Sequence, residues 1–285
     1  MTCRGDEANA AQIEYWNGQA GQRWQDRQRA HDQLLAPVAD LLLGRAAVRT
    51  GEMVLDIGCG CGATSLALAQ RVAPTGHVLG VEVSALLLER ARQRVTAGMP
   101  VSFVRADATV FPFELGRADL LCSRFGVMFF ADPVRSFLNM RTGLRSGGRL
   151  AFACWREPRE NPWLLLPLQE AYRHVPRLPE VGPEEPGPFS FADPMRVREI
   201  LGRAGFVTIK FESIDLSFDL AGGHGLDAAL DTALNMGPAS RALDGLSVQL
   251  RMAAAESIKA ALERYLMGGE VRLQGALWLV TAINP

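Results

Sequence analysis

Short apolar runs alternate with longer segments of helical periodicity through the middle of the chain. The apolar runs predict strands, and the segments between them carry apolar residues at the spacing of one helix face. The predicted strands are residues 53–57, 77–83, 101–105, 118–123 and 149–155. Strands joined by helix-length connections favour a parallel sheet with right-handed crossovers. The pattern therefore predicts a doubly wound α/β core over residues 49–155.

The first part of the chain, residues 1–48, predicts a helical arm instead of a strand. It is rich in Gln, Arg and Ala, and Pro37 suits the first turn of a second helix within it. The aromatic side chains of Trp16 and Trp24 interrupt this polar stretch. They either pack against the body of the protein or form a lid over a ligand, and the sequence leaves both interpretations open.

After residue 155 the regular alternation stops. Residues 156–188 are rich in proline and predict a mobile connection on the ligand side of the sheet. The elements expected beyond it are a helix after Asp193, a strand over 207–216, helices over about 226–267 and a last strand over 276–283. Residues 156–285 are therefore expected to complete the sheet and to insert a helical cap at about 226–267.

The composition is typical of a globular protein with a sizeable core. The chain has 285 residues, of which 48% are hydrophobic and 21% charged, and its formal net charge is −1. This balance gives no reason to expect nucleic acid or a membrane surface as a partner. No apolar run reaches the roughly 18–20 residues that span a membrane. A cytoplasmic location is expected.

The five cysteines stand at positions 3, 59, 61, 122 and 154. An odd number without framework spacing predicts reduced thiols instead of disulfides. Cys59 and Cys61 share one turn, but no further His or Cys follows at the spacing of a metal site. No metal site is expected.

The strongest chemical signal is the glycine-rich turn that follows the first predicted strand. Gly58, Gly60 and Gly62 stand at alternate positions between this strand and the next helix. Such a turn brings the backbone close to a ligand, and the free N–H groups of the helix start face outward. Asp56 adds an acceptor at the strand end, where open α/β sheets bind ligands. The turn is therefore expected to hold a small molecule.

The turn alone does not choose between two adenosine-containing cofactors. Gly58, Gly60 and Ala63 fit the dinucleotide fingerprint, and Glu82 ends the next strand, where a carboxylate can accept hydrogen bonds from both ribose hydroxyls. NAD and S-adenosylmethionine both remain open at this point.

Five segments carry further motifs, at residues 54–62, 80–84, 105–108, 119–125 and 144–150. Taken in order, they resemble the motifs of the class I S-adenosylmethionine-dependent methyltransferases. The resemblance extends over nearly the whole chain, and residues 123–133 are most similar to the small-molecule enzymes related to ubiquinone and menaquinone biosynthesis. The resemblance implies a Rossmann-like sheet of seven strands, mostly parallel, with an antiparallel last strand. Glu82 stands where the related small-molecule enzymes more often have Asp, and it keeps the carboxylate.

The resemblance also implies which residues hold S-adenosylmethionine. Glu82 falls in the ribose position, Asp107 in the position that accepts from the adenine amino group, and the next backbone amide faces a ring nitrogen. The residues expected to bind the cofactor are Asp56, Gly58, Cys59, Gly60, Glu82, Val83, Asp107, Ala108, Ser123 and Arg124.

A methyl group on a sulfonium is already activated, so the protein mainly has to align the acceptor and exclude water. This accounts for a sequence without an evident nucleophile, and no catalytic residue is assigned. His31, His174 and His224 are isolated and are not expected to act as bases. Aromatic residues stand where an apolar acceptor pocket is expected, although they also suit a core. These are Phe129, Phe130, Trp155, Trp163 and Phe189.

The sequence therefore predicts methyl transfer from S-adenosylmethionine to a small, largely apolar acceptor, with the methylated atom undetermined. A homodimer is left open. An NAD-dependent oxidoreductase is the first alternative, but Asp107 would then have no role and no Tyr-x-x-x-Lys motif is apparent. A non-catalytic module that binds an adenosine cofactor is the second alternative.

Overall fold

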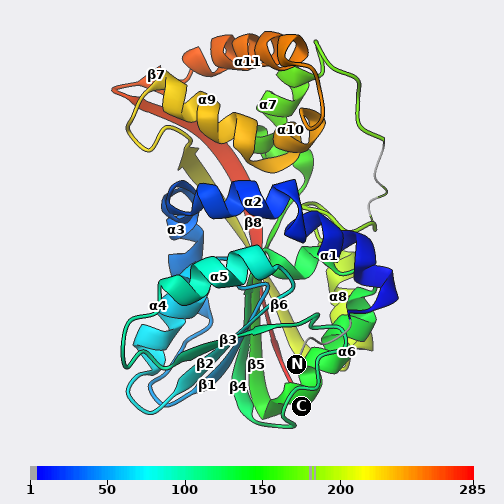
Figure 1. The fold of residues 1–285 in the computed structure, drawn as a ribbon. Coiled ribbons are helices and arrows are strands. Elements are labelled where there is room, and N and C mark those ends of the chain that lie inside the picture. Colours follow the sequence, from blue (N-terminus) through cyan, green and yellow to red (C-terminus); the bar gives the residue numbers. More distant parts are fainter. Residues whose placement is uncertain (1–4, 180–181, 183) are drawn as a thin grey trace.

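The computed structural model of the protein describes residues 5–179, 182 and 184–285. A twisted sheet runs through its centre (Figure 1). In chain order the strands are β1 (Met53–Ile57), β2 (His77–Glu82), β3 (Val101–Arg105), β4 (Ala118–Arg124), β5 (Leu144–Trp155), β6 (Val207–Asp219), β7 (Leu266–Met267) and β8 (Glu270–Ile283). Their order across the sheet is β3-β2-β1-β4-β5-β8-β6, and the short β7 pairs with β8 outside this path.

Strands β1 to β5 pair in parallel, and β8 pairs antiparallel with both β5 and β6. This confirms the predicted α/β sheet, mostly parallel with an antiparallel last strand. β4 and β6 end later than predicted, at Arg124 and Asp219, and β5 and β8 begin earlier than predicted. β5 begins at Leu144, which pairs with Ala118 ahead of a register shift. β8 begins at Glu270, because β6 and β8 continue to pair beyond Leu277, the last partner of β5.

Helices cover both faces of the sheet. Figure 1 shows α3 (Gln28–Arg45), α4 (Ala63–Val72) and α5 (Ala85–Gln93) together along one side, and α6 (Pro133–Gly143) and α8 (Pro194–Arg203) on the other. Side-chain caps fix where two of them begin. Ser84 accepts a hydrogen bond from the Leu87 N–H of α5, and Asp193 accepts one from the Met195 N–H of α8.

The helical arm consists of the single turn η1 (Glu7–Asn9), α1 (Ala10–Asn17), α2 (Gln19–Asp26) and α3. The prediction that Pro37 starts a helix was wrong, because Pro37 lies inside α3. Leu34, Leu35 and Val38 around it are buried in the core. Burial of this apolar face offsets the hydrogen bond that proline cannot donate.

Four helices form a layer beyond the carboxyl ends of the parallel strands. They are α7 (Pro162–Ala171), α9 (Leu226–Asn235), α10 (Gly237–Ala242) and α11 (Val248–Glu263). Figure 1 shows them gathered around the far end of the β6–β8 ribbon, with α2 between them and the sheet. The last three occupy the region predicted as a helical cap.

Helix α7 corrects one expectation. The segment 156–188 was predicted to be a mobile connection, yet it contains the single turn η3 (Pro158–Glu160) and α7. Pro162 occupies the first turn of α7, where a missing N–H costs nothing, and Pro167 lies within the helix. Within the described residues, no helix is long and apolar enough to cross a membrane.

Candidate functional site

A cavity of about 1350 Å³ lies at the carboxyl ends of the parallel strands and extends to the cap. Its walls come from the β1–α4 turn, the ends of β2 and β3, the segment after β4, helices α1, α2, α7 and α10, and part of residues 182–199. Eight of the ten predicted cofactor residues line it, namely Gly58, Cys59, Gly60, Glu82, Val83, Asp107, Ala108 and Arg124. The topology therefore brings together residues that lie in four separate motifs.

The glycine turn lines the cavity at the end of β1. Gly58 and Gly60 have φ angles of +64° and +55°, which favour glycine. A side chain on Gly58 would meet the Gly126 backbone at 2.7 Å, whereas one on Gly60 would point into open space. Ala63 and Thr64 also line the cavity, at the start of α4. Their backbone N–H groups have no acceptor within the helix and suit a negatively charged ligand group.

Glu82 connects the end of β2 to the glycine turn. Its Oε2 accepts a hydrogen bond from the Gly60 N–H at 3.0 Å, and its Oε1 accepts one from the Ser84 N–H at 2.9 Å. Burial raises the pKa of Glu82, while these N–H groups favour the charged form. The carboxylate retains further lone pairs toward the cavity, so it can accept from a ligand without losing either contact.

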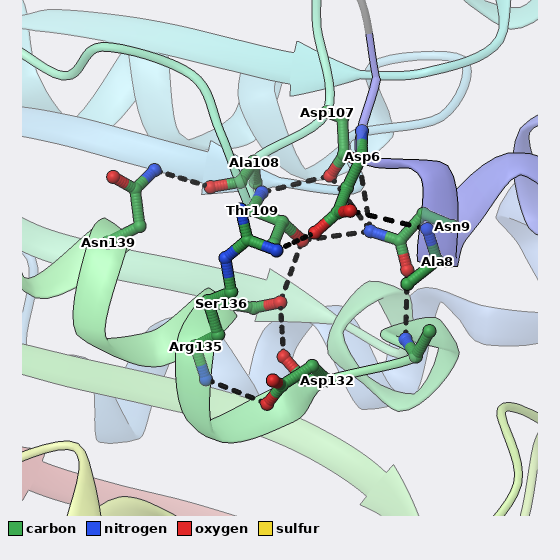
Figure 2. Close-up of polar contacts among 11 residues, drawn as sticks. Asp6, Ala8, Asn9, Asp107, Ala108, Thr109, Asp132, Arg135, Ser136 and Asn139 are labelled. Carbon is green, nitrogen blue, oxygen red and sulfur yellow. Dashed lines mark hydrogen bonds and ion pairs between the residues drawn. The ribbon is translucent and has the colours of Figure 1, made fainter.

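Asp107 is 3% exposed and lies at the end of β3 (Figure 2). The Thr109 N–H donates to its Oδ1 at 2.9 Å, and Asp6 and Asn9 of the arm also donate to it. Sequence reasoning missed these arm residues. Asn9 and Asp107 are 98 positions apart, and no local pattern connects them.

Asp56 and Ser123, the remaining two predicted residues, are not among those that line the cavity. The Ser65 hydroxyl donates to Asp56 Oδ2 at 2.5 Å, and the Ser123 hydroxyl donates to the Ile57 carbonyl at 2.8 Å. Both side chains are fully or almost fully buried. Their hydrogen bonds connect the ends of β1 and β4 to neighbouring elements inside the core.

We expect the Asp56→Asn variant to change how stability depends on pH. Burial raises the Asp56 pKa from its ordinary 3.8 to about 7. Because the folded state binds this proton more tightly, the free energy of unfolding falls as pH rises from about 4 to about 7 and stays lowered above that. This fall amounts to up to about 4 kcal/mol in the wild type, and it is absent from the variant, which has no carboxyl group to titrate. Urea unfolding of both proteins at pH 5 and pH 8 measures the free energies of unfolding.

An equal pH dependence in the Asp56→Asn variant and the wild type would contradict this account. Glu89→Gln is the control, because Glu89 is an exposed acid on α5. In this control, the free energy of unfolding is expected to differ between pH 5 and pH 8 by the same amount as in the wild type.

Arg124, at the end of β4, is one of the arginines that line the cavity. Its Nη1 lies 3.5 Å from the Leu35 carbonyl, a long contact that leaves the guanidinium able to bind a ligand. Burial lowers the Arg124 pKa, and the carboxylates of Asp32 and Asp56 oppose that change. A guanidinium remains charged in such surroundings and suits a carboxylate.

The cysteines and histidines contribute little to the chemistry of the cavity. Burial raises the pKa of Cys59 well above its usual value and that of Cys61 to about 12, so neither thiol is a ready nucleophile. Cys122 and Cys154 are buried and free, and Cys3 lies outside the described residues. Across the described part of the chain, no group of three or more His, Cys, Asp or Glu residues could hold a metal ion.

None of the four histidines is among the described residues that line the cavity. His31 is buried, and the centroid of its ring lies 4.2 Å from that of Trp24. Burial lowers the pKa of His31 to about 4. It is therefore neutral at physiological pH.

The cavity is lined in large part by aromatic side chains. All five aromatic residues proposed from the sequence line it, and they are Phe129, Phe130, Trp155, Trp163 and Phe189. Sequence reasoning did not assign Phe125, which also lines it and stacks on Trp155 with ring centroids 4.0 Å apart. Phe125 has a φ of +67°, a conformation that side chains other than glycine rarely adopt. Its backbone strain is retained where the ring meets the cavity.

The cavity is also bounded by the arm. Trp16 and Trp24 both line it, and Trp16 meets Phe129 edge to face with centroids 5.3 Å apart. Arg23 of α2 forms a bidentate ion pair with Asp244, just after α10, at 2.6 and 3.0 Å. The arm thus contacts both the sheet side and the cap.

Residues 54–148 match a family model described as a methyltransferase domain. An uncharacterised protein of Mycobacterium tuberculosis is 32% identical over 155 residues, which cover 54% of each chain. A 2-phytyl-1,4-naphtoquinone methyltransferase of Trichormus variabilis is 36% identical over 39% of this chain and 49% of that protein. The match thus spans about half the length of these curated relatives.

The fold has solved counterparts. Phosphoethanolamine N-methyltransferase 2 of Haemonchus contortus, solved in complex with S-adenosyl-L-methionine, superposes with a TM-score of 0.58 at 17% identity. The superposition covers 96% of this chain and 60% of that one. This similarity places the chain in the same fold.

Proposed function

Because residues 54–148 match the model of a methyltransferase domain, we propose that the chain is a class I S-adenosylmethionine-dependent methyltransferase, which transfers a methyl group from S-adenosylmethionine to a small, largely apolar acceptor. One observation carries the proposal. A continuous cavity joins the glycine turn and Glu82 at one end to an aromatic wall at the other. Donor and acceptor can therefore meet inside one enclosure.

The sheet end of the cavity has the groups that adenosine and a methionine moiety need. Glu82 would accept hydrogen bonds from the two ribose hydroxyls, and Asp107 from the adenine amino group. The Ala108 N–H would face a ring nitrogen. Arg124 and the start of α4 would hold the carboxylate of the methionine moiety.

The cap end favours a small apolar acceptor. Trp155, Trp163 and Phe189 line the cavity, and aromatic side chains of this kind suit contact with a flat apolar molecule. The ion pair between Arg23 and Asp244 closes the space between arm and cap. A folded protein or a nucleic acid duplex would have to open this contact, whereas a small molecule needs only the interior.

S-adenosylmethionine supplies an activated methyl group when it is bound. The residues of this chain would align the acceptor with the S–CH3 bond and keep water out. Trp16 and Phe129 lie where arm and sheet meet over the cavity and suit the second task. We assign no histidine as a general base, because the described residues that line the cavity include none.

A transfer assay with deuterated methyl donor tests the proposal. The full chain is incubated with S-adenosylmethionine carrying a CD3 group and a panel of acceptors. The panel holds small phenols, hydroquinones and naphthoquinols, with bulk protein and transfer RNA as large acceptors. Mass spectrometry is expected to find the CD3 group on a small aromatic acceptor. Labelled protein or RNA would contradict the proposed acceptor class, and reduction of NAD by a panel member would favour the oxidoreductase.

A further inference from the structure

The short turn at the start of the arm contacts the carboxylate of Asp107 directly. Figure 2 shows the Asn9 carboxamide and the Asp6 backbone directed at it. Asn9 Nδ2 lies 3.1 Å from Asp107 Oδ1 and 2.9 Å from Oδ2. The Asp6 N–H donates to Oδ2 at 3.0 Å. We call residues 6–9 the N-terminal turn.

These contacts use the hydrogen-bonding capacity of Asp107. An ionised carboxylate offers about four acceptor positions. The Thr109 N–H of the core donates to Oδ1, and the Asp6 N–H of the turn donates to Oδ2. The Asn9 Nδ2 lies within hydrogen-bond distance of both oxygens, and one of its N–H groups is shared between them. With the side chain 3% exposed, the docked turn covers both carboxylate oxygens, and another donor can approach them only if the turn gives way.

The docking of the turn is specific. Asn9 is 5% exposed, and its Nδ2 also donates to the Thr109 hydroxyl at 2.9 Å. Its Oδ1 accepts from the Ala131 N–H at 2.9 Å. Asp6 forms an ion pair with Arg135 of α6 at 2.5 Å. The turn is therefore held by the end of β3 and by the start of α6 together.

We propose that the N-terminal turn is an internal competitor for the adenine subsite, with Asn9 as the residue that determines how strongly the protein selects the adenine amino group. The inference rests on the proposed function, which gives Asp107 to that amino group. The Asn9 carboxamide presents an N–H2 group to the carboxylate, as adenine would. Binding of adenine at Asp107 must then release these contacts.

If the turn competes for Asp107, the wild type should bind a cofactor that has the adenine amino group only slightly more tightly than one that lacks it. A cofactor with an amino group exchanges one set of hydrogen bonds for another, so its net gain is small. A cofactor without that group leaves the turn in place. When Asn9 is removed, the amino group gains Asp107 without displacing a carboxamide, and the preference should grow.

The test compares S-adenosylhomocysteine with its 6-deamino analogue, in which purine riboside replaces adenosine. Calorimetric titration of the full chain gives the ratio of the two dissociation constants, deamino over amino. We expect Asn9→Ala to raise this ratio about ten-fold or more, the range for hydrogen bonds to a charged group. Glu7→Ala is the control, because Glu7 is exposed in the same turn and has no contact with Asp107.

A second pair of variants isolates a single N–H. Asp6 has a φ of −62°, which proline can adopt, so Asp6→Pro removes the N–H that donates to Asp107. Asp6→Ala loses the same side chain but keeps the N–H. We expect a higher ratio in Asp6→Pro than in Asp6→Ala.

The outcomes separate this inference from the proposed function. If the wild type binds neither nucleoside, the proposed function fails. If it binds both and the ratio is unchanged or lower in Asn9→Ala and Asp6→Pro, the competition is overturned while cofactor binding stands. Thermal unfolding of each variant establishes that it is folded before titration.

Discussion

Replacement of Glu82 by alanine is expected to weaken S-adenosylmethionine binding by about 1.5–3 kcal/mol or more, a factor of roughly ten to one hundred or more. The variant loses the acceptor proposed for both ribose hydroxyls. It also leaves the N–H groups of Gly60 and Ser84 without their partner, which loosens the glycine turn. Both effects act on the same ligand, so the loss should exceed that of an ordinary surface contact.

Calorimetric titration with S-adenosylhomocysteine measures this loss. Glu82→Gln keeps one carbonyl acceptor and is expected to bind with intermediate affinity. Glu89→Ala is the matched control, because Glu89 is an exposed carboxylate on the neighbouring helix and its side chain contacts Gln93. Unchanged affinity in Glu82→Ala would remove Glu82 from the cofactor site.

Substitutions at Gly58 and Gly60 are expected to affect different properties, namely stability at Gly58 and cofactor binding at Gly60. At Gly58 a new Cβ would lie 2.7 Å from the Gly126 backbone, and the φ of +64° is strained for alanine. Gly58→Ala should therefore lower the free energy of unfolding by about 2–4 kcal/mol. At Gly60 a Cβ meets nothing within 4 Å, because it points into the cavity. Gly60→Val should abolish cofactor binding with a smaller loss of stability.

Urea unfolding and calorimetric titration of both variants separate the two effects. Gly98→Ala is a control for positive φ alone, since Gly98 has a φ of +81° with no atom near a new Cβ. If Gly60→Val binds S-adenosylhomocysteine as the wild type does, the turn is not part of the cofactor site. If Gly58→Ala is no less stable than Gly98→Ala, the contact with Gly126 carries no weight.

The central strands were predictable because their signals are local. The strands 53–57 and 101–105 have the predicted bounds, since each is a short apolar run that ends at a turn or a polar residue. Helix α7 was missed because Pro162 and Pro167 resemble helix breakers. Packing of α7 against α10 and α11 supports the helix, and that packing lies far away in the sequence.

Residue type alone could not distinguish the cavity wall from the layer behind it. Asp56 and Gly58 are two positions apart, yet Gly58 lines the cavity and Asp56 hydrogen-bonds to Ser65 within the core. The contact between Asn9 and Asp107 could not be predicted from the sequence for a related reason. It depends on where the arm docks, and no spacing rule connects an N-terminal turn to the end of β3.

Titration of the full wild-type chain with S-adenosylhomocysteine and, separately, with NAD tests the central claim most directly. Both molecules contain adenosine, and the glycine turn with Glu82 is compatible with either. The account predicts saturable binding of one S-adenosylhomocysteine per chain and no measurable binding of NAD. Tight binding of NAD with none of S-adenosylhomocysteine would contradict it.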